Sequence, residues 1–306
     1  MKVVETGPVR AVVRVKRRFA NSWIEQDTIL YAHSDSVDFA LRCDWHEQYR
    51  FAKIAFPLAL QSHYATYEIP FGSIQRYDHT LTNDPQEKLA HPARAWEPAD
   101  RTKYEVAAQR WVDVTDRSGS YGISLLNDSK YGFSFQGNTL RMSLVRGPRR
   151  GYPRTPETWS DQSDDPIVGI HRVGYSVVPH RGDWRAAHTA RRAVEFNAPL
   201  LVRIEPAHPG KTAVPLATMV VEPENVVVEA MKKAEDSDEF IVRLYETFGK
   251  ASEAVLSFGR KPSSVRETDM LEWDRYVQPK LFRVVGNKAR ISVSPFEIKT
   301  LRVKFA

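Results

Sequence analysis

The chain has 306 residues, of which 42% are hydrophobic and 27% charged, and its formal net charge is +6. This is the composition of a soluble globular protein, and the length suffices for two ordinary domains. No stretch approaches the roughly eighteen consecutive apolar residues of a membrane span, so we expect no such span. Acids and bases are interspersed and no recognition motif is present, so we expect no nucleic-acid partner.

The N-terminus and the cysteine content bear on the cellular compartment. Residues 1–5 include an acid and no long apolar core, which argues against a secretory signal. Cys43 is the only cysteine, so no internal disulfide framework can form. We therefore expect a cytoplasmic protein.

Alternating apolar and polar residues predict antiparallel strands in the first part of the chain. The clearest case is 37–45, where valine, phenylalanine, leucine, cysteine and tryptophan occupy every second position. Ser34-Asp35-Ser36 before it is a turn signal. The other strands predicted here are 9–15, 23–31, 53–58, 65–69, segments within 112–126, and 170–178.

The stretch from 104 to 148 has the most informative pattern. An apolar run, 123–126, leads into a polar turn that Gly132 closes, and glycine there would allow a positive φ at no steric cost. Residues 133–135 and 140–144 predict two further strands joined by a tight turn at 136–138. Pro148, which lacks an N–H, is expected to end the second of them.

The turn and the strand ends carry side chains of mixed chemistry. They are an amide, a carboxylate, an ammonium, a phenol and a guanidinium, contributed by Asn127, Asp128, Lys130, Tyr131 and Arg146. Each hydroxyl of a sugar needs both donors and acceptors around it, so this mixture suits a polyhydroxylated ligand.

The remaining chain contains one convincing helix and a second group of strands. Residues 147–166, with almost no aliphatic side chains, predict a long surface loop. Asp183 can cap a helix over 184–196. Residues 205–218 contain three prolines and one glycine and read as a link. The strands predicted after it have the spacing of a small β-sandwich and are 225–231, 240–245, 254–258, 281–285, 289–293 and 297–305. The chain is thus expected to be all-β in two domains, 1–204 and 205–306.

Three strings resemble the C-terminal β region of the α-mannosidases of glycoside hydrolase family 38, above all its bacterial and vacuolar branch. They are EVAAQRWVD (105–113), LLNDSKYG (125–132) and LRMSLVRGP (140–148). Shorter matching strings lie in the expected order at 7–11, 67–72, 179–184 and 241–246. The resemblance implies that 1–204 form a large β super-sandwich, galactose-mutarotase-like, and that 205–306 form a small immunoglobulin-like β-sandwich.

The resemblance also implies where the chemistry of the complete enzyme takes place. Family 38 members are retaining glycosidases that use two carboxylates and a zinc ion. In the family these belong to an N-terminal α/β barrel and an adjoining helical bundle, and a His-x-Asp pair binds the zinc. This chain shows neither the alternating strands and helices of a barrel nor a helical bundle, so we expect it to begin after both of these domains. We expect no catalytic residue and no cofactor in it, with zinc held by the missing domain.

His33-Ser34-Asp35 matches His-x-Asp literally. As a metal site it would supply two zinc ligands. The simpler interpretation is a polar turn between two strands, which we prefer because no third ligand lies near in the sequence. The acidic residues are too numerous for the sequence to select a catalytic pair.

In this family, loops of the β region lie over the mouth of the barrel. The resemblance therefore assigns five residues to the rim of the substrate cleft, and they are Asn127, Asp128, Lys130, Tyr131 and Arg146. The alternative is that Asn127-Asp128 forms a turn and that Lys130 pairs locally with Asp128. Tyr67 and Glu68 are a second candidate for this rim. The alternative is that they simply belong to a strand that ends at a proline. The tryptophans that could stack on sugars are more simply assigned to the core, and they are Trp45, Trp111 and Trp184.

The resemblance predicts the C-terminal β domain of a retaining α-mannosidase, inactive alone. Its partners would be the catalytic domain, in the same or a separate chain, mannosides or oligosaccharides, and further copies in a homo-oligomer. The alternative is a stand-alone carbohydrate-binding or scaffolding β protein without hydrolase activity. An exposed apolar patch would favour the first hypothesis, and a closed polar surface with one aromatic pocket the second.

Overall fold

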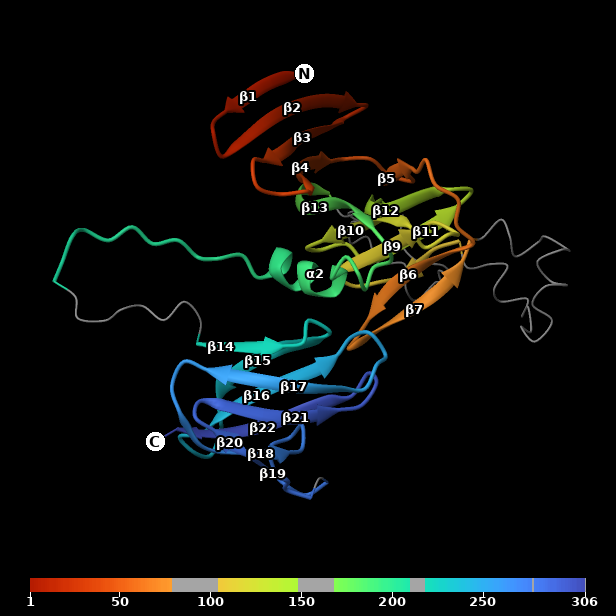
Figure 1. The fold of residues 1–306 in the computed structure, drawn as a ribbon. Coiled ribbons are helices and arrows are strands. Elements are labelled where there is room, and N and C mark those ends of the chain that lie inside the picture. Colours follow the sequence, from red (N-terminus) through yellow and green to blue (C-terminus); the bar gives the residue numbers. More distant parts are fainter. Residues whose placement is uncertain (79–103, 148–167, 210–217, 277, 306) are drawn as a thin grey trace, which may run out of the picture. The chain divides into compact units, whose positions relative to one another are not determined.

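The computed structural model describes residues 1–78, 104–147, 168–209, 218–276 and 278–305, which form β-strands and one α-helix (Figure 1). Internal contacts divide the chain into two units. The first is Met1–Ile69 with Ile74–Ala198, and the second is Pro70–Ser73 with Pro199–Ala306. The all-β prediction is confirmed.

The first unit contains a nine-stranded sheet in the order β1-β2-β3-β4-β13-β10-β9-β6-β7. Its strands are β1 (Lys2–Thr6), β2 (Arg10–Phe19), β3 (Ser22–Tyr31), β4 (Val37–Trp45), β6 (Tyr64–Ile69), β7 (Gly72–Tyr77), β9 (Trp111–Thr115), β10 (Tyr121–Asn127) and β13 (Gly169–Arg181). Strand β2 pairs antiparallel with β3, β3 with β4, β4 with β13 and β13 with β10, as their alternating sequences predict.

A second, four-stranded sheet of this unit has the order β5-β12-β11-β8. Its strands are β5 (Phe51–Pro57), β8 (Val106–Ala107), β11 (Gly132–Gln136) and β12 (Thr139–Arg146). Leu41 and Tyr175 of the large sheet share one hydrophobic core with Phe133 and Met142 of the small sheet. The two sheets therefore form a sandwich over a common core.

Strand β4 shows how the sequence positions the two faces of the large sheet. Its boundaries, Val37–Trp45, are those predicted. Leu41, Cys43 and Trp45 are at most 4% exposed and belong to the core. The alternate residues, including Ala40 and Arg42, point to the opposite face because successive side chains of a strand alternate. That outer face is where charged residues of neighbouring strands meet.

The hairpin of β11 and β12 confirms one turn prediction and corrects another. Gln136 pairs with Thr139, and the two residues between them, Gly137 and Asn138, have φ of 54° and 60°. Two successive positive φ values make a type I′ turn, which matches the twist of the strands. The predicted positive φ of Gly132 is wrong. A Cβ there would lie 3.2 Å from the Ser143 Cβ, so Gly132 serves close packing in β11.

The predicted helix is shorter than expected. Helix α2 spans Thr189–Asn197, whereas the prediction began at Trp184. Asp183 does bind backbone N–H groups, those of Arg185 and Ala186, but it thereby holds a separate turn. His188, with φ of 52°, lies between this turn and the helix. The left-handed residue breaks the continuous helix that the apolar periodicity suggested.

The second unit is a sandwich of a four-stranded and a five-stranded sheet, β14-β17-β21-β20 and β15-β16-β22-β18-β19. Its strands are β14 (Met219–Glu222), β15 (Val226–Lys233), β16 (Phe240–Glu246), β17 (Ser252–Phe258), β18 (Pro262–Thr268), β19 (Leu281–Phe282), β20 (Val284–Val285), β21 (Lys288–Val293) and β22 (Ile298–Phe305). Val242 and Leu301 of one sheet share a core with Leu256 and Ile291 of the other.

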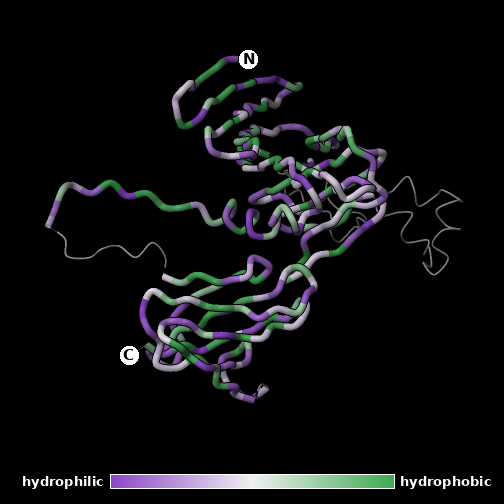
Figure 2. The backbone as a smooth tube through the Cα atoms, viewed as in Figure 1, coloured by the Kyte–Doolittle hydropathy of each residue, from purple (hydrophilic) through white to green (hydrophobic). Residues whose placement is uncertain are grey.

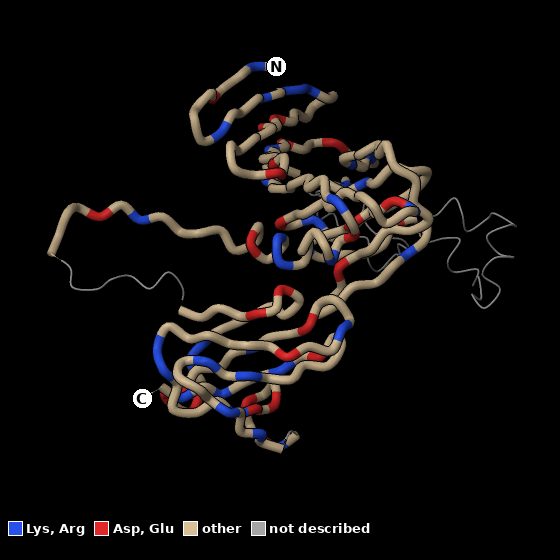
Figure 3. Tube along the Cα trace, viewed as in Figure 1, with Lys and Arg blue, Asp and Glu red and all other residues tan. Residues whose placement is uncertain are grey.

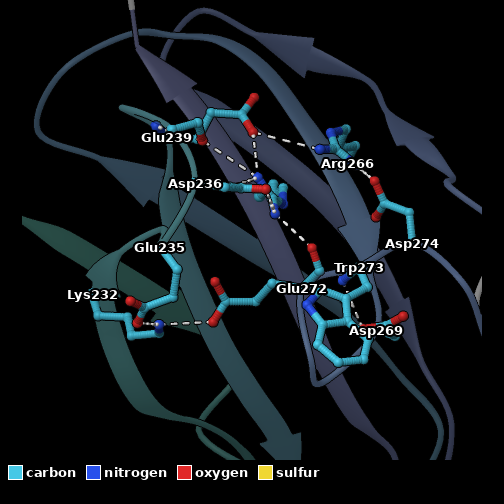
Figure 4. A network of polar contacts seen from close by, with 11 residues as sticks. Lys232, Glu235, Asp236, Glu239, Arg266, Asp269, Glu272, Trp273 and Asp274 are labelled. Atoms are coloured by element: carbon cyan, nitrogen blue, oxygen red, sulfur yellow. Dashed lines mark hydrogen bonds and ion pairs between the residues drawn. The ribbon is translucent and has the colours of Figure 1, made fainter.

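A polar network covers one part of the five-stranded sheet of this unit (Figure 4). Arg302 of β22 is 4% exposed and donates to both carboxylate oxygens of Asp236, at 2.8 and 3.0 Å. It also donates to Glu239 and to the carbonyl of Glu272. Asp269 accepts hydrogen bonds from four backbone N–H groups of the loop that follows it. The network therefore ties this loop to the sheet.

Several strands were not predicted, and irregular structure begins a few residues before the predicted link at 205–218. Strands β1, β7, β14 and β18 are short or irregular in alternation, and β18 begins with a proline. Residues 199–209 have no regular secondary structure and carry exposed aliphatic side chains, which Figure 2 shows as hydrophobic stretches. Among the described residues, no helix has the length and apolar character that crossing a membrane requires. The predicted loop at 147–166 and the strand end at Pro148 lie almost wholly outside the described residues.

Candidate functional site

Asn127 ends β10 and forms the turn that follows it. Its side chain is 1% exposed, and its Oδ1 accepts hydrogen bonds from the N–H groups of Ser129 and Lys130, at 3.1 and 2.7 Å. Its Nδ2 donates to the carbonyl of Gln109 at 2.8 Å. The side chain thus replaces missing backbone partners, as asparagine does in such turns. The structure supports the turn-forming interpretation of Asn127.

Asp128 is fixed against β13 by backbone and side-chain hydrogen bonds. Its Oδ2 accepts from the N–H of Gly174 at 2.8 Å, and its Oδ1 accepts from the Ser129 hydroxyl at 2.6 Å. A Cβ on residue 174 would lie 2.7 Å from that Oδ2. Glycine is therefore what allows the carboxylate to lie over β13.

Lys130, Tyr131 and Arg146 differ in their exposure. Burial lowers the pKa of the half-buried Lys130, while the charge of Asp128 and the thiol of Cys43 act in the opposite direction. Tyr131 is 60% exposed. Arg146 is exposed at the end of β12, in the smaller sheet. The turn thus brings Asn127, Asp128 and Lys130 together and leaves the Tyr131 ring facing solvent.

Tyr67 and Glu68 are both buried in β6, at 1% and 2% exposure. Burial raises the pKa of the Tyr67 phenol, and the Arg76 guanidinium lies 4.8 Å from the centre of its ring. Glu68 accepts from the Arg110 backbone N–H at 2.6 Å and from its guanidinium at 2.8 Å. Both side chains are thus occupied within the first unit, and their assignment to a cleft rim stays a prediction.

His33 and Asp35 lie in the connection between β3 and β4, where a turn was expected. Both carboxylate oxygens of Asp35 accept hydrogen bonds from Arg192 of α2, at 2.6 and 2.9 Å. This pairing holds the pKa of Asp35 below its usual value. No group of three or more potential metal ligands occurs within the part of the chain that the structure describes. Because its acid is already bound to an arginine, the His-x-Asp pair does not fit a zinc site.

The three tryptophans assigned to the core are buried there, at 2%, 1% and 2% exposure for Trp45, Trp111 and Trp184. The Trp111 and Trp184 rings pack against each other with their centres 5.0 Å apart. The core assignment is confirmed.

Asp128 lines a hollow of about 350 Å³ on the outer face of the large sheet. The other residues around it come from β3, β4 and β13, and they are Glu25, Asp27, Ala40, Leu41, Arg42, Arg172, Val173 and Gly174. Acids and bases lie on adjacent strands in this part of the chain (Figure 3). Of the residues around this hollow, only Asp128 was a candidate from the sequence. The available signal was the polar face of each alternating strand, but only the strand register shows which polar residues meet.

Comparison with known proteins identifies the family. Residues 1–165 match the glycosyl hydrolases family 38 C-terminal domain, and residues 225–301 match the family 38 C-terminal beta sandwich domain. Alpha-mannosidase G of Dictyostelium discoideum is 30% identical over 310 residues, which cover 98% of this chain and 26% of that protein. Human alpha-mannosidase 2C1 is 31% identical over 284 residues, covering 92% of this chain and 24% of that protein.

A solved structure supports the fold. The crystal structure of an alpha-mannosidase from Enterococcus faecalis V583 superimposes with a TM-score of 0.75 at 16% identity, covering 98% of this chain and 34% of that one. The chain spans about a quarter of the length of the curated relatives it matches. It belongs to glycosyl hydrolase family 38, and its two matched regions are the C-terminal domains of that family.

Proposed function

We propose that the chain is the C-terminal β portion of a retaining α-mannosidase, that it supports the catalytic domain and lines the mannoside cleft, and that it is inactive alone. The observation that carries the proposal is the match of nearly the whole chain to about a quarter of proteins named α-mannosidases. The remaining three quarters of those proteins are long enough for the barrel and helical bundle that the family resemblance implies. A catalytic domain is therefore the partner that we propose.

The turn after β10 gives this role a physical form. Three hydrogen bonds of the buried Asn127 side chain fix the turn, and the Gly174 N–H holds the Asp128 carboxylate, so this carboxylate has little freedom to lose on binding. The carboxylate of Asp128 can accept from sugar hydroxyls, and the exposed Tyr131 ring can pack against a sugar face and hydrogen-bond through its phenol. Such groups position a substrate without taking part in bond cleavage.

In the complete enzyme, zinc would help to distort and hold the terminal mannose. The residues described here do not provide its site, because Asp35 of the only His-x-Asp pair is bound to Arg192. We therefore assign the metal to the catalytic domain. The cytoplasmic location and the homo-oligomer expected from the sequence also remain proposals.

The proposal is tested by hydrolysis of a chromogenic α-mannoside with the purified chain, with and without added zinc. We expect no turnover in either condition. Zinc-dependent turnover that is lost in His33→Ala and Asp35→Ala would overturn the proposal. When the chain is joined to a catalytic domain, we expect Tyr131→Ala to lower kcat/KM, and the exposed Arg290→Gln control to leave it unchanged.

A stand-alone carbohydrate-binding protein is the second candidate, and the hollow beside Asp128 is the observation that favours it. Calorimetric titration of the chain with methyl α-mannoside separates the two. Binding by the isolated chain that disappears in Asp128→Ala would support the stand-alone binder. We expect no measurable binding, because the proposed cleft is complete only with the catalytic domain.

A further inference from the structure

Two arginines lie directly opposite each other on the outer face of the large sheet. Arg42 of β4 and Arg172 of β13 are register partners, so their Cβ atoms are neighbours across the strands. Glu25 of β3 is the partner of Arg42 on its other side, and Lys16 of β2 is the partner of Glu25. Like charges directly opposite in an antiparallel pair are destabilising. The pair therefore needs either a neighbouring acid or a ligand to offset its charge.

The acids around the hollow are occupied by other groups. Asp27 accepts from the Arg14 guanidinium at 2.7 and 2.8 Å, and Arg14 and Lys16 lie 3.8 and 3.6 Å from Glu25. The Asp128 carboxylate accepts from the Gly174 N–H and the Ser129 hydroxyl. Asp27 and Asp128 thus already have hydrogen-bond donors, and Glu25 has two cations within 4 Å.

Neither Arg42 nor Arg172 forms an ion pair with any residue that the structure describes. The Arg42 Nε is buried without a hydrogen-bond partner, and its guanidinium lies 5.1 Å from the centre of the Trp23 ring. Arg172 is exposed. Guanidinium N–H groups of both residues are therefore available beside the hollow.

Small residues form the floor next to the arginines. Ala40 and Gly174 are register partners on the same two strands, two positions along from Arg42 and Arg172, and so lie on the same face. Ala40 is exposed and adds only a methyl group to the floor, whereas the Asp128 carboxylate lies over Gly174 and borders the hollow there. The space of about 350 Å³ can hold one compact polar group and part of a sugar ring.

We propose that this hollow binds an oxyanion, and that the anion is the phosphate of a phosphorylated sugar. Planar guanidinium groups bind phosphate through paired N–H donors, and two adjacent arginines would each gain the acceptor they lack. Asp128 and Glu25 keep lone pairs that can accept from hydroxyl groups, which favours a sugar phosphate over the free ion. The proposal is independent of the proposed mannosidase role, because no step of it needs a catalytic domain.

The test is calorimetric titration of the intact chain in phosphate-free buffer with inorganic phosphate, glucose 6-phosphate and glucose. We expect both anions to bind, glucose 6-phosphate more tightly than phosphate, and glucose not to bind. Arg172→Gln should weaken anion binding at least tenfold, and Arg172→Lys should weaken it less because it keeps the charge but loses the planar fork. Arg290→Gln, which removes an exposed arginine paired with Glu253 in the second unit, is the matched control and should bind as the wild type does.

Absence of binding by either anion would overturn the proposal, as would unchanged binding in both Arg172→Gln and Arg42→Gln. Because Arg172 is exposed, its replacement should leave the chain folded, which circular dichroism can verify. Equal affinity for phosphate and glucose 6-phosphate would contradict the sugar assignment. None of these readouts involves mannoside hydrolysis, so a failure here is distinguishable from a failure of the proposed function.

Discussion

Arginines of the two units have contrasting surroundings. Arg302 in the second unit is buried and is bound by two carboxylates and a backbone carbonyl. Arg42 and Arg172 in the first unit are neighbours across two strands, and neither is paired with an acid that the structure describes. The same side-chain type is thus paired with acids in one sandwich and not paired with a described acid in the other.

This difference distinguishes charged side chains that stabilise the fold from charged side chains that bind a ligand. A buried ion must have its partners, because removing one leaves an uncompensated charge in a poorly solvated place. A charged pair that opposes folding and has no partner is a local conflict of the kind that proteins retain at functional sites. We therefore regard the Arg302 network as part of the fold, and the Arg42–Arg172 pair as a binding site.

The largest expected effect is that of removing the compensated arginine. Arg302→Met leaves Glu239 and the Glu272 carbonyl without this donor, while the mostly exposed Asp236 can be solvated. We expect the free energy of unfolding of the second unit to fall by about 3 kcal/mol. Hydrogen exchange of β16 and β22 amides measures it. A change as small as that of the exposed Arg290→Gln control, expected within about 0.5 kcal/mol, would contradict the structural role.

The next effect concerns the turn that carries Asp128. Asn127→Ala removes one donor and one acceptor from a buried side chain that makes three hydrogen bonds. We expect a loss of about 2 kcal/mol in denaturant unfolding. Ser129→Ala is the matched control, since its hydroxyl donates only to Asp128 on the exposed side, and it should cost less than about 1 kcal/mol. Equal losses in the two variants would show that the turn is not held by Asn127.

A smaller effect is expected for the floor of the hollow. Gly174→Ala would place a Cβ 2.7 Å from the Asp128 Oδ2, so the carboxylate must leave the Gly174 N–H. Because the clashing atom ends a side chain that can rotate, we expect a loss of only about 1 kcal/mol. Anion binding should weaken at the same time, since the new methyl group occupies the floor. Calorimetry measures the anion affinity of this variant, and denaturant unfolding measures its stability. If neither quantity differed from that of the wild type, the geometry would be contradicted.

The smallest effect is a change in pH dependence. Hydrogen bonds from Arg302 lower the pKa of Asp236 below its ordinary value of 3.8. A carboxyl group with a depressed pKa stabilises the folded state above its unfolded pKa, and this contribution is lost as the pH falls through the folded value. Stability of the second unit should therefore fall with acidification below about pH 4, and less steeply in Arg302→Met. Parallel pH profiles of the wild type and this variant, measured by hydrogen exchange, would contradict the assignment.

Much of the fold could be predicted because alternation and turn chemistry act locally. Val37–Trp45 alternates so cleanly that its strand boundaries are those predicted, and the turn at Gly137-Asn138 follows from the residues that tolerate positive φ. The start of α2 could not be predicted, because the left-handed His188 interrupts a continuous apolar period. The role of Gly132 depended on Ser143, a contact across the hairpin that no local pattern shows.

The site was less predictable, because it depends on strand register. Asp128 was identified from its turn, but Glu25, Arg42 and Arg172 appear in the sequence only as ordinary polar positions of alternating strands. Arg42 and Arg172 are far apart in the sequence and become neighbours only through the pairing of β4 with β13. That pairing depends on the whole sheet, so no local pattern in the sequence brings them together.

The most direct measurement is the free energy of unfolding of Arg172→Gln in phosphate-free buffer, compared with the wild type. If Arg172 opposes folding and serves a ligand, the variant should be as stable as the wild type or more stable by a few tenths of a kcal/mol. A loss of more than about 1 kcal/mol would mean that Arg172 has a compensating partner in the folded protein. It would then resemble Arg302, and the distinction between the two arginine groups would be wrong.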